Sequence, residues 1–173
     1  MWLKLNLEGM KINIQIRNYG KSDKDIWDMQ YCKVDFSFIF RDIINYENSS
    51  EILLSCEIEK LKEKLDDLLN DRIAKEFELE FIEPDFMFHF SLKIKKEIYT
   101  INQEDTPKYF TTKPYLEWKI NLWNDGLTSN YFSTTLDIDD IKALRCYLSL
   151  IMGTITTDDK EVIKYMNKGI ITE

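Results

Sequence analysis

The sequence contains one histidine, His89, which is a candidate for acid–base catalysis. An imidazole near neutral pH can serve as the base for a cysteine or serine nucleophile. His89 lies between Met87 and Ser91 in an alternating stretch, where a lone histidine is more often an ordinary surface or half-buried residue. A hydrolase centred on His89 is therefore our third hypothesis, and His89→Ala, which should abolish turnover, would test it.

The three cysteines, Cys32, Cys56 and Cys146, are an odd number without a Cys-x-x-Cys pair. A zinc site would have to gather them and His89 from four distant segments, whereas structural zinc sites use closely spaced ligand pairs. We expect free thiols in a reducing compartment and no metal site.

Carboxylates are abundant, because Asp plus Glu is 31 and Lys plus Arg is 23, a formal net charge of −8. Glu83 and Asp85 flank a proline, which suits a turn, and three aspartates within residues 137–140 suit the positive end of a helix. An acid and base pair of the glycosidase type is defined by distance in space, which the sequence does not supply. We predict no catalytic residue and read the chain as a binding protein, not an enzyme.

Cofactor, nucleic-acid and membrane binding are all disfavoured. The five glycines are scattered, so the chain has no phosphate-binding glycine loop and no Gly-x-Ser-x-Gly elbow. Negative charge opposes binding to a phosphate backbone and favours solubility or attraction of a basic partner. The longest apolar runs fall far short of the roughly 20 residues that cross a bilayer. Because Met1–Asn6 alternates like a strand and does not resemble a signal peptide, we expect a cytoplasmic protein.

Alternating apolar and polar residues predict that strands dominate the chain. Residues 3–16 form a hairpin turning at Glu8–Gly9, and Tyr31–Phe40 is a long one-sided strand that residues 42–47 extend or follow as an edge. The alternation changes phase around Pro84, which has no N–H to donate, so we expect a break there. Residues 102–114 are predicted to be a long loop. A second hairpin follows, with strands 116–122 and 131–136 and a turn at Asn124–Gly126.

Apolar residues at helical spacing predict three helices. The first begins at Ser55 as N-cap and ends at Asn70; the second is capped by Asp137 with Asp140 and ends at Gly153. A short last helix begins at Asp158 with Glu161 and ends at Gly169. The predicted fold is α+β, a mainly antiparallel sheet of hairpins with two longer helices and a short C-terminal helix packed against it. Without repeats or linkers, residues 1–173 are predicted to be a single domain.

Two groups of side chains are candidates for contact with a partner. Opposite the apolar stripe of the first helix lie Glu59, Glu63 and Asp66, and two further aspartates follow. Aromatic anchors dominate the energetics of many interfaces, and Trp123 differs in strand parity from the core residue Trp118. The competing interpretation is that these residues are a solvated helix face and ordinary core aromatics. The predicted partner-binding residues are Glu59, Glu63, Asp66, Asp67, Asp71, Tyr109, Phe110 and Trp123.

The order of features from Trp27 to Gly153 resembles the WapI family of bacterial immunity proteins. The resemblance rests on the aromatic strand, the Ser55 helix, Leu79–Phe88 (LEFIEPDFMF), the tryptophan strand and Leu136–Leu144 (LDIDDIKAL) followed by Tyr147 and Leu148. It implies an inhibitor of a toxin domain carried at the end of a large secreted or wall-associated protein, often a nuclease acting on RNA. It brings no catalytic residue.

Two functions of different classes follow. The leading hypothesis is an immunity protein that covers the substrate channel of a cognate, basic toxin domain. The alternative is a non-enzymatic module that binds a small ligand or a regulator. A deep apolar pocket lined by aromatic residues would favour the module, and a filled core with a flat charged face would favour the inhibitor. The oligomeric state is left open.

Overall fold

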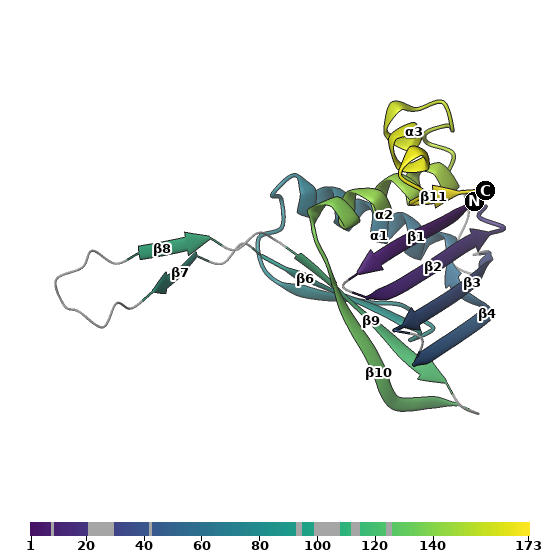
Figure 1. Cartoon of the computed structure of the whole chain (residues 1–173), viewed down its shortest axis with the longest axis horizontal. Helices are drawn as coiled ribbons and strands as arrows, with labels where there is room; N and C mark the ends of the chain where they lie inside the picture. The colour runs from purple at the N-terminus through teal and green to yellow at the C-terminus, as the bar shows by residue number, and fades with distance from the viewer. Residues whose placement is uncertain are drawn as a thin grey trace.

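A computed structural model of the chain describes residues 1–7, 9–20, 30–41, 43–92, 95–98, 108–111, 115–123 and 126–173. The strands in these ranges form three antiparallel sheets (Figure 1). In spatial order, the first sheet holds β11 (Ile171–Thr172), β1 (Trp2–Leu7), β2 (Met10–Arg17), β3 (Tyr31–Phe40) and β4 (Ile44–Leu54). The second sheet holds β10 (Leu127–Leu136), β9 (Tyr115–Trp123), β6 (Phe86–Ser91) and β5 (Phe77–Glu80), and the third pairs β7 (Lys95–Ile98) with β8 (Lys108–Thr111). The helices are α1 (Ser55–Leu69), α2 (Ile138–Ile151) and α3 (Lys160–Asn167).

The predicted fold class is confirmed: an α+β protein built mainly from antiparallel sheet. The first hairpin and the strand Tyr31–Phe40 have the predicted places, and the phase change at Pro84 is the turn that joins β5 to β6. Residues 44–47, for which the prediction was open, begin β4 at the edge of the first sheet.

The core lies between the inner faces of the two larger sheets and the helices. Alternate side chains of β1, β2 and β3 are buried, and the register places Leu5 opposite Ile12 and Ile12 opposite Phe38. From the second sheet, Trp118 is only 1% exposed and stacks on Phe88, with ring centroids 5.2 Å apart. Burial of such large aromatic side chains is a main source of the fold's stability.

The structure corrects two predicted helix starts. The N-cap of α1 is Leu54, because the side chain of Glu57 accepts a hydrogen bond from the Leu54 N–H (2.8 Å). Ser55 is instead the first helical residue, and its hydroxyl contacts Cys32 Sγ at 3.6 Å. The N-cap of α3 is Asp159, not Asp158, because Asp159 accepts the Glu161 N–H at 2.8 Å.

The start of α2 is as predicted. Asp137 Oδ1 accepts the N–H groups of Asp139 (2.8 Å) and Asp140 (3.0 Å), and Asp140 accepts the Asp137 N–H at 3.2 Å. Gly153 follows the helix end with φ +67°, a conformation that costs glycine little. α2 packs against α1 and contacts β1 and β10, so the capped end of α2 lies where the two sheets meet.

The predicted loop 102–114 is wrong in part, because residues 108–111 form β8 and pair with β7. Residues 102–107 and 112–114 lie outside the described residues, as do 124–125 of the predicted turn. The β7–β8 hairpin projects away from the two larger sheets (Figure 1). It departs from the last register pair of β6 and β9, Ser91 opposite Tyr115.

The short strand β11 was not predicted. It pairs with the first residues of β1, with Trp2 opposite Thr172 and Leu3 opposite Ile171. Two residues are too few for an alternation pattern, so only the partner strand reveals it. No helix in the described ranges is long and apolar enough to cross a membrane.

Candidate functional site

The predicted carboxylates of α1 lie together on one side of the helix and just beyond its end. We name Glu59, Glu63, Asp66, Asp67 and Asp71 the α1 acidic surface. The side chain of Glu63 is 67% exposed, whereas those of Asp66 and Asp67 are only 24% and 22% exposed. Glu63 is therefore open to solvent, whereas Asp66 and Asp67 are partly covered.

Cations cover them. The ion pairs are Lys62–Asp66 (2.6 Å), Lys64–Glu63 (3.0 Å), Lys64–Asp67 (3.1 Å), Arg72–Asp67 (2.9 Å) and Arg145–Asp66 (3.8 Å). Hydrogen bonds from Lys64 and Arg72 lower the pKa of Asp67. The pKa of Lys64 is raised by its hydrogen bonds to Glu63 and Asp67. Because each cation cancels charge at close range, this surface has a weaker field than its five carboxylates suggest.

Glu59 has a different partner. The Tyr19 hydroxyl donates to Glu59 Oε1 at 2.7 Å, and burial together with this hydrogen bond raises the pKa of Tyr19. The pair ties the helix to the segment after β2. Glu59 therefore has a structural task in addition to any contact with a partner.

The structure does not bring the predicted aromatic anchors together. Tyr109 and Phe110 belong to β8, where their register partners are Glu97 and Lys96. Trp123 ends β9 and pairs in register with Leu127. The hairpin that holds β8 leaves the sheet near Tyr115, the other end of β9, and a nine-residue strand is roughly 26 Å long. The side chains of these three aromatic residues lie outside the description.

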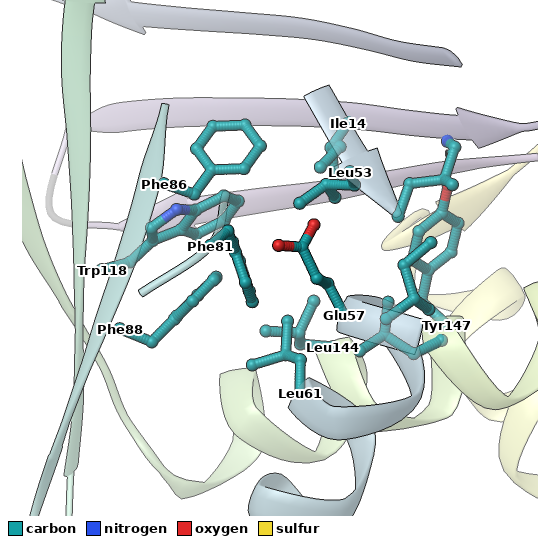
Figure 2. A pocket seen from close by; sticks show the side chains of 13 residues that line it. Ile14, Leu53, Glu57, Leu61, Phe81, Phe86, Phe88, Trp118, Leu144 and Tyr147 are labelled. Atoms are coloured by element: carbon teal, nitrogen blue, oxygen red, sulfur yellow. Dashed lines mark hydrogen bonds between the residues drawn. The ribbon is translucent and has the colours of Figure 1, made fainter. Parts of the chain in front are cut away.

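The space enclosed between the sheets and helices is filled. Figure 2 shows aromatic side chains of the second sheet, among them Phe86, Phe88 and Trp118, packed with aliphatic residues around a pocket. The cavity that they leave has a volume of only about 10 Å³. That volume is about the smallest that holds one water molecule, so no ligand fits. This cavity is therefore not the deep ligand pocket that a small-ligand module would need.

Glu57 projects into this core from the first turn of α1 (Figure 2). Its carboxylate accepts the N–H of Leu54 at 2.8 Å and the N–H of Ile82 at 2.7 Å. A buried carboxylate is tolerated when it is hydrogen-bonded in this way. Glu57 thus fastens the start of α1 to the β5–β6 connection, a role that the sequence analysis missed.

His89 lies on the outer face of the second sheet, as its parity predicted. Its register neighbours are Glu78 and Glu117, and its Nδ1 is 3.8 Å from Glu78 Oε1. The nearby Ser91 hydroxyl donates to Glu76 at 3.0 Å. His89 therefore lies between two glutamates in the register, and the Ser91 hydroxyl is hydrogen-bonded to Glu76. Among the residues that the structure describes, no three His, Cys, Asp or Glu residues are grouped for a metal ion.

A groove of about 780 Å³ runs between the end of the first sheet and the edge of β10. We name it the β10 groove. It touches three consecutive residues of β10, Ser133–Thr135, and because neighbouring strand residues face opposite ways, it must follow the backbone edge of the strand. Its lining consists of Asn6, Leu7, Met10, Phe40, Glu117, Ser133, Thr134, Thr135, Asp137 and Asp140.

The β10 groove is acidic and has no lysine, arginine or histidine in its lining. Its carboxylates belong to Glu117, Asp137 and Asp140, and no described cation forms an ion pair with them within 4 Å. Glu117 accepts a hydrogen bond from the Ser133 hydroxyl. Burial, with the negative charge of Asp137 and Asp139 beside it, raises the pKa of Asp140 to about 6. Sequence reasoning assigned the two aspartates to the helix cap and missed the groove.

The model of one family, the immunity protein WapI-like family, matches residues 3–152. The match includes the first hairpin, which the resemblance read from the sequence did not cover, and every residue that lines the β10 groove. No curated protein matches the chain.

Proposed function

The chain belongs to the immunity protein WapI-like family, and from this premise we propose that it binds and neutralises a cognate toxin domain. The observation that carries the proposal is the extent of the match, which runs from β1 through α2. The filled core supports it, because a protein that acts through its surface needs no internal ligand cavity.

In its finer form, the proposal is that the toxin is a nuclease and that the inhibitor covers its active site. A nuclease must bind phosphates, so its substrate channel is basic, and a partner with a net charge of −8 is attracted to it. A standard interface of about 800 Å² on each partner would use less than a tenth of the 10856 Å² surface of this chain. Such an interface is large enough to exclude a nucleic acid from the channel.

The α1 acidic surface is proposed to help steer the toxin towards this protein, with Tyr109, Phe110 and Trp123 as candidate anchors. Steering depends on the field at a distance, and the ion pairs on α1 weaken that field without abolishing it. We therefore expect these carboxylates to affect the association rate more than the lifetime of the complex.

The decisive experiment takes as the candidate toxin a large reading frame directly upstream of this gene. Its C-terminal domain is expressed with and without this protein, and growth, complex formation in a pull-down and nuclease activity on RNA are measured. We expect survival, a stable complex and loss of the toxin's nuclease activity on RNA only when this protein is present. A toxin domain from an unrelated pair is the control. If the cognate domain neither binds nor is neutralised, the proposed function is wrong.

A second experiment tests the α1 acidic surface alone. Glu59, Glu63 and Asp66 are changed to lysine in one variant, and Glu47, Glu51 and Asp158 are changed to lysine in a control variant. The net charge of the protein therefore becomes less negative by the same amount in both. We expect the first variant to associate with the toxin several-fold more slowly than the control at low salt, with the difference shrinking at high salt. Equal rates for the two variants and the wild type would remove this surface from the proposal.

A further inference from the structure

We infer that the β10 groove receives an extended, basic segment of the toxin, which adds to the free edge of β10 as a new strand. This inference rests on the proposed function and names the surface and the chemistry of the segment that it binds.

The edge of β10 has backbone groups available for such a partner. In the described part of the chain, β10 pairs with β9 on one side and ends the second sheet on the other. Along an edge strand, alternate residues direct their N–H and C=O groups away from the sheet, and these groups are a template for another strand. The register with β9 is regular from Tyr131 to Leu136, and its irregularity lies before Tyr131. Residues 131–136 therefore form six residues of regularly paired edge strand.

The sequence of this edge does nothing to prevent pairing. Proteins usually protect edge strands with lysine, proline or a bulge. Residues 131–136 are Tyr-Phe-Ser-Thr-Thr-Leu, of which Tyr, Phe and both Thr favour strands, and none of the six is charged or a proline. The edge of the first sheet differs, because β4 carries the exposed charges of Glu47 and Glu51 along its length.

The two sides of the groove define the occupant. Phe38 packs on Phe132 with ring centroids 4.2 Å apart, so the inner face of the first sheet, with Phe40, lies beside the inner face of β10. Glu117 lies on the outer face, directly opposite Thr135 in the register. Since an added strand points alternate side chains to these two sides, the partner segment alternates apolar and basic residues.

Charge decides between possible occupants. Three carboxylates without a cation in the lining favour lysine and arginine. A second copy of this chain would bring its own acidic groove and a net charge of −8. The partner's basic segment is therefore the occupant that we propose, and self-association is an outcome of the test.

The test changes one exposed residue of the edge, Thr135, to lysine, with Thr135→Gln as the control of similar length without charge. Lysine at this position faces Glu117 and repels a basic segment, so the dissociation constant of the toxin complex should rise at least about tenfold. The glutamine variant should bind like the wild type. Thermal unfolding of both variants verifies that they are folded.

Hydrogen exchange followed by NMR then tests strand addition itself. In the complex, the amides of residues 131–136 that point away from β9 should become protected, which gives an every-second-residue pattern that contact between side chains would not produce.

The outcomes separate this inference from the proposed function. If the wild type binds the toxin and Thr135→Lys binds equally well, or the alternating protection is missing, the groove proposal is wrong and the proposed function stands. If the free chain sediments as a dimer that protects the same amides, a second copy occupies the edge and the groove proposal is wrong. If the wild type does not bind the toxin at all, both fall together.

Discussion

The α1 acidic surface and the β10 groove both gather carboxylates, but they treat the charge differently. On α1, Glu63, Asp66 and Asp67 each have a lysine or arginine within 4 Å. In the groove, hydrogen bonds come from backbone N–H groups and a serine hydroxyl, which leave the net negative charge in place. A formal charge summed over a sequence therefore does not locate the field, because the field depends on where the cations lie.

The largest expected effect tests Arg145, a cation of α2 that pairs with the α1 acidic surface. Arg145 is 25% exposed and bridges Asp66 on α1 and Glu161 on α3, so Arg145→Ala leaves two carboxylates without this partner. We expect a loss of about 2 kcal/mol in the free energy of unfolding, measured by urea denaturation. Lys160→Ala, at an exposed position, should change stability by less than about 0.5 kcal/mol. Equal effects would mean that Arg145 does not hold this surface together.

A smaller effect is expected in the groove, where Asp137 stabilises the backbone of α2. Asp137→Ala removes the acceptor for two N–H groups and should cost about 1 kcal/mol in the free energy of unfolding. Asp137→Asn keeps an acceptor oxygen and should be close to wild type. If both variants were equally destabilised, the charge of Asp137, and not its hydrogen bonds, would be the important property.

The smallest effect concerns pH. The pKa of Asp140 in the folded state is raised to about 6. Above pH 6 the folded state therefore holds an unfavourable charge on Asp140, which lowers the free energy of unfolding. This loss of stability disappears below about pH 4, where Asp140 is protonated in the folded and the unfolded state alike. Asp140→Asn should therefore unfold at a slightly higher urea concentration than the wild type at pH 7.5. The difference should disappear by pH 4. A difference that grows towards low pH would contradict the raised pKa.

Much of the fold could be predicted because its signals are local. The alternation in Tyr31–Phe40, the proline at residue 84 and the Asp137–Asp140 capping pair each depend on a few neighbouring residues. The shift of the α3 N-cap from Asp158 to Asp159 is a local error of one residue, whereas the other errors involve a distant partner. The N-cap of α1 is fixed by Glu57, whose second hydrogen bond reaches Ile82, and β11 exists only against β1.

The candidate site was harder to predict for the same reason. Glu59, Glu63 and Asp66 share a helix, so their spacing alone predicted a common surface, but two of their contacts come from distant segments: Arg145 of α2 pairs with Asp66, and Tyr19 donates to Glu59. The β10 groove is assembled from residues 6–10, 40, 117 and 133–140, and no short window of the sequence contains its geometry.

The pairing of Ser91 with Tyr115 means that the second sheet is complete without the projecting β7–β8 hairpin. β6 and β9 are aligned by six consecutive pairs that end at these two residues, so the alignment does not depend on what joins them. Partners that face each other across two antiparallel strands are close enough for a turn of two residues to connect them. We therefore expect that changes in the length or sequence of the β7–β8 hairpin, Tyr109 and Phe110 included, leave the two larger sheets and the β10 groove unchanged.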